Sequence, residues 1–294
     1  MVNPRAGKGR VGKELPRLIS LIEADGGHPE VLLTGHSGHA TELAHDVAVR
    51  GADTIVAVGG DGTINEVVNG MIHDDRPVGT STMAVVAAGS GCDFARSFDL
   101  PGHVGDHLNG FDGHTRPLDV GRIRCVDRDR EVTRYFVNVA EAGMAAATVR
   151  RAAGYPRWMG RSRYVVAFWP SLARFKPVEV AVTTLEASYS GTAHNVLVAN
   201  ARYFGGGMHI SPHSDPSDGT FDAQISIGPK RQAFTMIPRF FRGTHLPDPR
   251  IIQMSSSRFT IEAKWPILVE ADGEMVGETP ATITVLPGLL QLQT

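Results

Sequence analysis

Residues 54–70 read Thr54-Ile-Val-Ala-Val-Gly-Gly-Asp-Gly-Thr-Ile-Asn-Glu-Val-Val-Asn-Gly70, and this stretch decides the fold. A β-branched run enters a glycine-rich turn, and residues 63–71 then repeat apolar side chains at helical spacing. Glycines let a backbone approach its ligand closely, and a helix N-terminus attracts anions such as a polyphosphate. A carboxylate beside phosphates needs a cation between them, so Asp61 indicates Mg²⁺. The alternative is an ordinary strand-to-helix turn with Thr63 as its N-cap.

Outward from this stretch, the first half of the chain alternates helix and strand patterns. Helical spacing predicts helices over residues 12–24, 40–49 and 93–98, and apolar runs predict strands over 30–34 and 82–88. Strands that alternate with helices indicate parallel βαβ units whose sheet is covered by helices.

The pattern changes near residues 109–117, which are rich in Gly, Asp and Pro. Beyond them we expect one helix over residues 163–175 and the following short strands: 133–139, 178–185, 195–199, 221–227, 251–261, 267–269 and 281–285. The sequence therefore predicts two domains: an α/β nucleotide-binding domain over residues 1–115, and a mostly antiparallel β domain, interrupted by one or two helices, over residues 116–294.

Composition limits the class of protein. The 294 residues are 42% hydrophobic and 20% charged, which suits a folded core. The apolar runs are far shorter than the roughly 18 residues of a membrane span, and no secretion signal is recognisable. Two cysteines suggest a reducing compartment, so we expect a soluble, cytoplasmic protein.

Charge is distributed unevenly along a chain whose net charge is −2. Residues 150–176 contain seven Lys and Arg and no acid, and residues 230–242 contain four and no acid. Both segments also contain aromatic residues. This asymmetry predicts an anionic partner for one part of the molecule, and we expect no nucleic acid among its partners.

Three further motifs carry polar groups beside flexible backbone. Ser90 and Asp93 lie in a second strand-to-helix turn, where they would form another wall of a nucleotide site or simply cap a helix. A loop over residues 204–222 combines three glycines with closely spaced acids, which suits a hard cation or a plain turn. Asp272-Gly-Glu274 lies between strands. Three histidines at 36, 39 and 45 have loose ligand spacing without an acid to complete a set, so we expect surface or capping roles.

Taken together, these motifs resemble the diacylglycerol kinase catalytic family, which includes sphingosine and ceramide kinases. Gly59-Gly-Asp-Gly-Thr-Ile-Asn-Glu-Val-Val-Asn-Gly70 is similar to its signature, Asn3-Pro-Arg-Ala-Gly7 to its opening nucleotide loop, and Gly89-Ser-Gly-Cys-Asp-Phe-Ala-Arg96 to its next segment. The later motifs follow in the family's order: Leu118-Asp-Val-Gly121, Asn138 with Gly143, Asn200 through Gly207, Pro212 through Asp222, and Asp272-Gly-Glu274. The resemblance covers essentially the whole chain and is closest to the soluble bacterial lipid kinases.

This resemblance implies an N-terminal α/β domain like those of NAD kinase and phosphofructokinase, a C-terminal β-sandwich for the lipid, and ATP-dependent phosphorylation of a lipid hydroxyl. It implies an ATP site made of Asn3, Thr34, Gly60, Asp61, Gly62, Thr63, Ile64, Asn65, Glu66 and Ser90. It also implies a Mg²⁺ site at Asp215, Asp218 and Thr220, linked by Asp119 to the active site.

For the chemistry we expect Glu274 as general base, with Asp61 and Asp93 holding the catalytic Mg²⁺. The substrate would be diacylglycerol or a related lipid, reached by reversible, peripheral docking at a membrane. Two alternatives stay open. One is an NAD kinase-like activity. The other is a catalytically weak nucleotide-binding regulator, which would suit Cys92 in place of a usual Asn and the two residues ahead of Asn3. The sequence leaves the oligomeric state open, a homodimer included.

Overall fold

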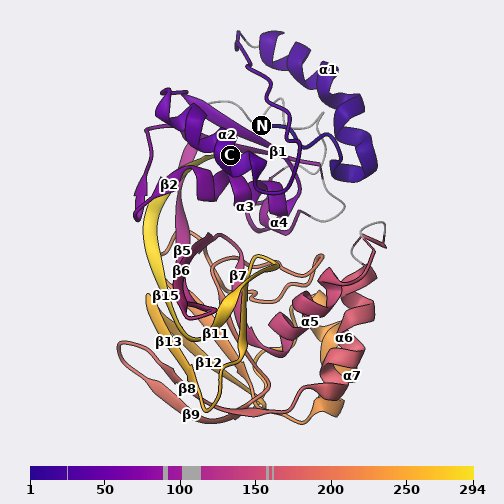
Figure 1. The fold of residues 1–294 in the computed structure, drawn as a ribbon, viewed down its shortest axis with the longest axis vertical. Helices are drawn as coiled ribbons and strands as arrows, with labels where there is room; N and C mark the ends of the chain where they lie inside the picture. Colours follow the sequence, from indigo (N-terminus) through magenta and orange to yellow (C-terminus); the bar gives the residue numbers. More distant parts are fainter. Residues whose placement is uncertain (25, 89–91, 101–113, 157–158, 161) are drawn as a thin grey trace. The chain divides into compact units, whose positions relative to one another are not determined.

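The computed structural model describes residues 1–294 except 25, 89–91, 101–113, 157–158 and 161 (Figure 1). The chain divides into two compact units, Met1–Val120 with Pro287–Thr294, and Gly121–Leu286. Among the described residues, no helix is both long and apolar enough to cross a lipid bilayer.

The first unit is an α/β body. Its helical elements are η1 (Ala6–Gly9), α1 (Arg10–Ala24), α2 (His39–Val49), α3 (Asp61–Gly70) and α4 (Asp93–Ser97). Its strands are β1 (Thr54–Gly59), β2 (Ile72–His73), β3 (Arg76–Pro77) and β4 (Thr82–Ala87). β1 and β4 pair in parallel, with Gly59 opposite Ala87, and α3 connects them on one side of the sheet. The predicted βαβ arrangement is confirmed.

The N-terminal residues extend this sheet. Val2 forms parallel bridges to both Val58 and Leu33, so the segment 1–3 lies between β1 and residues 32–34. The predicted strand over 30–34 is reduced to the single bridge at Leu33. Val31 and Leu33 are 37% and 52% exposed. Among the described residues this segment pairs only with the N-terminal one, so it forms an edge of the sheet.

The second unit is mostly antiparallel sheet. Its strands are β6 (Arg130–Phe136), β7 (Val139–Gly143), β8 (Val178–Thr183), β9 (Ser188–Ala193), β10 (Asn195–Ala199), β11 (Phe221–Ser226), β12 (Ile251–Ser256), β13 (Arg258–Ala263) and β14 (Leu268–Ala271). Its helical elements are α5 (Met144–Ala153), α6 (Ser162–Arg174), η4 (Lys230–Gln232) and α7 (Ala233–Arg242). Two long strands, β5 (Thr115–Asp127) and β15 (Glu274–Gln293), are shared by both units.

Several sequence-based expectations for this unit are wrong in detail. Residues 251–261 form two strands, because the chain bends at Ser257 between β12, which pairs with β11, and β13, which pairs with β15, and no Gly, Pro or Asn marks the bend. Residues 133–139 divide between β6 and β7. Besides the expected α6, two further helices, α5 and α7, interrupt the strands.

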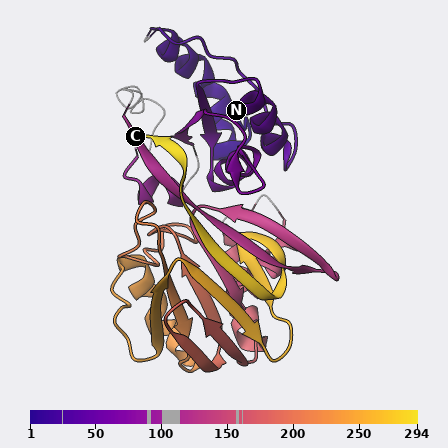
Figure 2. The same ribbon diagram turned by 90° about the vertical axis from the view of Figure 1, so that its left-hand side faces the viewer.

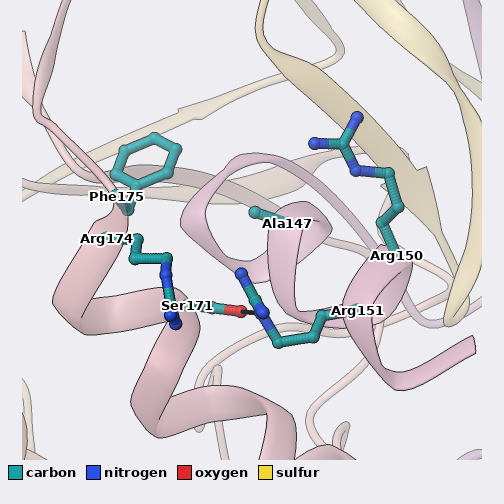
Figure 3. A pocket seen from close by; sticks show the side chains of 6 residues that line it. All are labelled: Ala147, Arg150, Arg151, Ser171, Arg174 and Phe175. Carbon is teal, nitrogen blue, oxygen red and sulfur yellow. Dashed lines mark hydrogen bonds between the residues drawn. The ribbon is translucent and has the colours of Figure 1, made fainter. Parts of the chain in front are cut away.

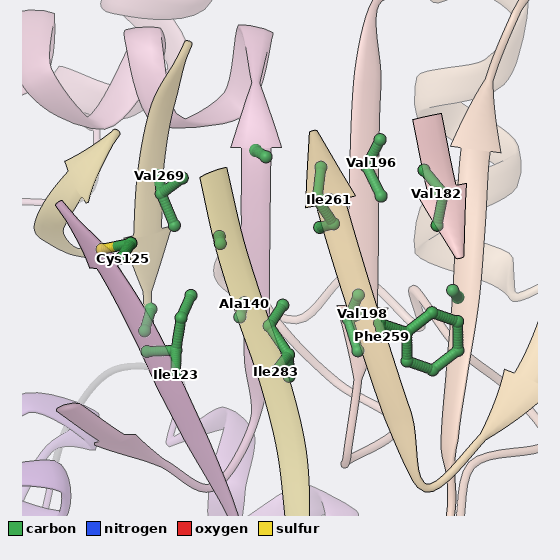
Figure 4. Close-up of a cluster of buried hydrophobic side chains, with 14 of the residues drawn as sticks. Ile123, Cys125, Ala140, Val182, Val196, Val198, Phe259, Ile261, Val269 and Ile283 are labelled. Atoms are coloured by element: carbon green, nitrogen blue, oxygen red, sulfur yellow. The ribbon is translucent and has the colours of Figure 1, made fainter. Parts of the chain in front are cut away.

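The predicted β-sandwich is confirmed by its core (Figure 4). One sheet path runs β12-β11-β10-β7-β14-β15-β13-β8-β9. Val196 and Val198 of β10 pack in one cluster with Val182 of β8 and Phe259 of β13, although these strands are far apart along the path. Such side chains can meet only if the sheet curls so that one half covers the other, which is a sandwich.

The last strand returns to the first unit. β15, the long yellow strand of Figure 2, begins in the second unit, and its end pairs with β4 through Leu292 and Met83. There Asp119 accepts a hydrogen bond from the Gly288 N–H at 2.6 Å. The sequence predicted only residues 281–285 of this strand, because Pro287 and Gly288 resemble a strand end.

Candidate active site

The turn between β1 and α3 has the geometry of an anion site. Gly59 requires glycine, because an added Cβ would lie 2.5 Å from Thr63 Oγ1. Gly62 is exposed, and a Cβ there would meet nothing within 4 Å. The fold itself therefore does not demand glycine at 62, whereas a phosphate that contacts the helix N-terminus would.

Asp61 joins this turn to the one that follows β4. Its Oδ1 accepts a hydrogen bond from the Phe94 N–H, at the start of α4, at 3.1 Å. Cys92 Sγ–H donates to the Gly59 carbonyl at 3.4 Å, so the two turns are joined twice. Asp93 is only 3% exposed and lies beneath the surface. Ser90 falls outside the described residues.

Asn3 and Thr34 lie at the same edge of the sheet. Asn3 Nδ2 donates to Thr63 Oγ1 at 3.3 Å, and the Thr34 N–H donates to the Val2 carbonyl at 2.9 Å. Because Val2 lies between Val58 and Leu33, the residue that follows each of the three comes to one edge. The fold thus brings Asn3 and Thr34, from two separate segments, to the glycine turn that begins at Gly59.

Three further predicted ATP residues on α3 are buried or hydrogen-bonded within the protein. Ile64 is fully buried, and its N–H donates to the Gly60 carbonyl. Asn65 is 7% exposed. The Glu66 carboxylate accepts the Gly38 and Ala40 N–H groups at 2.8 and 3.1 Å, so it caps the N-terminus of α2. Their contact with ATP remains a prediction.

In the second unit, Glu274 lies at the tip of a tight hairpin. Asp272 and Gly273 connect β14 to β15 with φ of 48° and 83°, the backbone of a type I′ turn, for which Asp-Gly is a favoured pair. The Asp272 carboxylate accepts the N–H groups of Val137, Asn138 and Val139 at 2.9–3.0 Å. Glu274, the next side chain, is exposed. The hairpin thus presents a carboxylate from a firmly held turn.

Two buried acids lie beneath this hairpin. Glu141 of β7 and Glu270 of β14 are directly opposite each other in the pairing, and Glu270 is fully buried. Burial raises the pKa of both carboxyls, most strongly that of Glu270. Sequence reasoning missed both residues, since each is a single acid within an apolar strand.

The predicted metal loop is locally ordered by its own acids. Asp218 Oδ1 accepts the Thr220 N–H and hydroxyl at 2.8 and 2.9 Å, and Asp215 Oδ1 accepts the Ser217 N–H and hydroxyl. Asp218 Oδ2 accepts no hydrogen bond from the residues that the structure describes. Carboxylate and carbonyl oxygens are the ligands Mg²⁺ prefers, so the donor set fits. Asp119 belongs to the first unit, and its link to this loop stays a prediction.

We expected no acid near the three histidines, but the structure places Glu42 beside His36 and His39. Ligand atoms of His36, His39 and Glu42 lie within 4.8 Å of one another. The two imidazoles are stacked with an interplanar angle of 13°, so their in-plane lone pairs lie in separate, nearly parallel planes, which does not favour a shared ion between them. His39 Nδ1 also accepts the Gly35 N–H at 3.0 Å, which suits the expected capping role.

A cationic cavity of about 360 Å³ lies between α5 and α6 (Figure 3). Arg150, Arg151 and Arg174 line it together with Ser171, which accepts a hydrogen bond from Arg151 Nε at 3.1 Å. Arg150 and Arg174 are exposed and form no ion pair with any described residue. The basic segment predicted from sequence therefore gathers uncompensated positive charge at one place.

Both units match known protein families. Residues 1–123 match the family described as the diacylglycerol kinase catalytic domain, and residues 138–294 match the YegS C-terminal NAD kinase beta sandwich-like domain. A diacylglycerol kinase of Bacillus subtilis is 30% identical, over 95% of this chain and 89% of its own. The chain belongs to the bacterial diacylglycerol kinase family. By that membership it is a lipid kinase, and a kinase of this family implies ATP as phosphoryl donor.

Three further likenesses agree with this assignment: a relative that supports the family, and two solved structures that support the fold. A diacylglycerol kinase of Mycobacterium tuberculosis is 29% identical, over 99% of this chain and 93% of its own. The crystal structure of a diacylglycerol kinase from Bacillus anthracis superimposes with a TM-score of 0.74 at 22% identity, over 99% of this chain and 94% of that one. Yeast NADH kinase in complex with NADH shares the fold with a TM-score of 0.51 at 12% identity, over 95% and 77%. At these identities both structural likenesses concern the fold alone.

Proposed function

We propose that this lipid kinase phosphorylates a hydroxyl of diacylglycerol or a closely related lipid, with ATP and Mg²⁺. The observation that carries the proposal is the joined pair of turns after β1 and β4, where Asp61 binds the Phe94 N–H beside an exposed glycine. Curated relatives that match nearly the whole chain bear the name diacylglycerol kinase. The test is phosphoryl transfer from radiolabelled ATP to a panel of lipid alcohols, with NAD as a competing acceptor.

In this proposal the N-terminus of α3 and the Gly62 backbone receive the phosphates of ATP. Asn3 and Thr34, at the same sheet edge, contact the nucleotide. Asp61 holds the catalytic Mg²⁺, and Asp93, being buried, acts through water or through Asp61. When bound, Mg²⁺ neutralises the charge that develops on the transferred phosphoryl group.

Glu274 is the proposed general base. A lipid hydroxyl is a weak nucleophile, so a carboxylate must take its proton during attack. The exposed position of Glu274 allows a substrate hydroxyl to reach it, and the hydrogen bonds of Asp272 hold the turn that carries it. A fixed base matters, because misplacing a reacting group by 1 Å can cost about 100-fold in rate.

The Asp218 loop is proposed to bind a second, structural Mg²⁺. In the absence of nucleotide, Mg²⁺ should raise the melting temperature of the wild type, since a ligand that binds only the folded state stabilises it. Asp218→Ala should abolish this increase. Glu186→Ala is the control: it removes an exposed acid from the turn between β8 and β9, and should leave the increase unchanged. A wild-type melting curve that is identical with and without Mg²⁺ contradicts the site.

We also propose that the helical side of the second unit docks on anionic membranes. Val165, Val166 and Trp169 of α6 and Phe234 and Phe241 of α7 are exposed apolar residues, and we call them the α6–α7 patch. Trp169 stacks on Phe234 with ring centroids 4.9 Å apart, which joins the two helices (Figure 1). The cationic cavity shares α6 with this patch. Each Lys or Arg near an anionic leaflet adds about 1 kcal/mol, and interfacial aromatics add to that.

Co-sedimentation with phosphatidylcholine vesicles, with or without phosphatidylglycerol, tests this docking. The wild type should bind the anionic vesicles and lose binding at high salt. The double variant Arg150→Glu/Arg174→Glu should lose the preference for anionic vesicles. The single variant Phe234→Ser should bind more weakly to all vesicles. Leu185→Ser changes an equally exposed apolar residue between β8 and β9 and should have no effect. Equal binding of the wild type to neutral and anionic vesicles would refute the electrostatic part.

A further inference from the structure

The buried acids Glu141 and Glu270 face away from the sandwich core. Ala140 and Ala142 of β7, with Val269 and Ala271 of β14, belong to that core, so the alternating acids point to the opposite face of the sheet. Helix α5 packs on both strands. The two acids are cross-strand partners, and their exposed fractions are 8% for Glu141 and zero for Glu270.

Hydrogen bonds connect the pair to the hairpin on one side and to α5 on the other. Glu270 Oε2 accepts the Gly273 N–H at 2.7 Å, and Gly273 directly precedes Glu274. Asn195 Nδ2 donates to Glu141 Oε1 at 2.8 Å, and Asn195 Oδ1 accepts the Ala145 N–H at 3.0 Å. Glu270 is therefore the side chain that binds the backbone next to the proposed base.

Two negative charges on this buried pair would be unfavourable. Among the described residues, the charged group outside the pair that acts on Glu270 is Asp272, another acid. Arg150 and Arg151 of α5 line the cavity toward α6 instead. Glu270 Oε1 is buried without an N–H or O–H donor among the described residues. A carboxyl oxygen in that position is satisfied if it holds a proton and donates to Glu141. Burial and the neighbouring Glu141 raise the pKa of Glu270 in agreement with this arrangement.

We propose that Glu270, paired with Glu141 through a shared proton, is a positioning residue for Glu274. It fixes the Gly273 N–H from below the hairpin, while Asp272 fixes the turn from the β6–β7 connection. The inference rests on the proposed role of Glu274 as base. Glu270 itself touches no substrate in this proposal.

The shared proton makes the arrangement sensitive to rising pH. Once it dissociates, two buried carboxylates face each other, and their repulsion displaces Glu270 from Gly273. Because the folded-state pKa of Glu270 is raised, the folded state binds more protons than the unfolded state above about pH 4.5. Stability should then decrease as the pH rises from that value to the folded-state pKa.

Glu270→Gln tests the pair with minimal disturbance. Its amide can donate to Glu141 and accept the Gly273 N–H, but it has no proton to lose. We expect its kcat at neutral pH to stay close to that of the wild type. The losses of kcat and of melting temperature that we expect for the wild type as the pH rises should be absent. Glu270→Ala removes the acceptor for Gly273 and should lower kcat about 100-fold, with a nearly unchanged KM for ATP.

The controls separate this inference from the proposed function. Glu278→Gln changes an exposed acid on the same strand β15 and should behave like the wild type. If Glu274→Gln retains activity, the proposed base is wrong. If Glu274→Gln is inactive but Glu270→Gln has the same pH profile of kcat as the wild type, the positioning role is wrong. That comparison needs only the Gln variant, so it holds even if Glu270→Ala does not fold.

Discussion

Replacing Asp61 with asparagine should lower turnover by about 10³-fold while the protein still folds. A bound metal contributes several kcal/mol of charge stabilisation, and each 1.4 kcal/mol is about a factor of ten in rate. Asparagine keeps an oxygen that can accept the Phe94 N–H, so the link between the two turns survives. What is lost is the negative charge that we propose holds Mg²⁺. The measurement is kcat with ATP and a lipid acceptor, with circular dichroism to verify the fold.

Asp53→Asn is the matched control for this experiment. Asp53 is exposed and immediately precedes β1, at the end of that strand opposite the glycine turn. It should retain full activity. Asp61→Ala should lose as much turnover as Asp61→Asn, because both remove the charge. Wild-type turnover by Asp61→Asn would show that the charge has no role in the reaction, and the proposed metal site at this turn would be abandoned.

The first unit was predictable because its signals are local. The β-branched run, the glycines and the apolar spacing of residues 54–70 place β1, the turn and α3 within a few residues of where the structure has them. The bond from Phe94 to Asp61 joins residues 33 positions apart and has no local signature. The hydrogen bond by which Glu66 caps α2, from the Gly38 N–H 28 positions earlier, likewise has no local signature.

The second unit was harder because its determinants are long-range. The turn at Ser257 contains only serines, so nothing marked the end of β12. The predicted strand 267–269 stopped before Glu270, since an acid usually ends a buried strand. The chain continues through Glu270 because Glu141 on the neighbouring strand and Gly273 satisfy its carboxyl. Such pairing can be recognised only when the register between strands is known.

The other large effect is expected at Glu274. Glu274→Gln should lower kcat by roughly 10²–10⁴-fold, the usual cost of losing a general base. The KM for ATP should change little, since Glu274 lies in the second unit and we place the nucleotide in the first. The glutamine keeps the size of the side chain, and the hairpin is held by Asp272 and Glu270, so the fold should be retained.

The decisive comparison for this prediction uses the same strand. Glu278→Gln neutralises another exposed acid four residues along β15 and should leave kcat unchanged, which separates the loss of a base from a general change of charge. If Glu274 only bound the substrate, its replacement would raise the KM for the lipid and leave kcat near the wild-type value. If Glu274→Gln keeps more than about a tenth of wild-type kcat, proton removal must be assigned to another group, since the loss of a base costs at least about 100-fold.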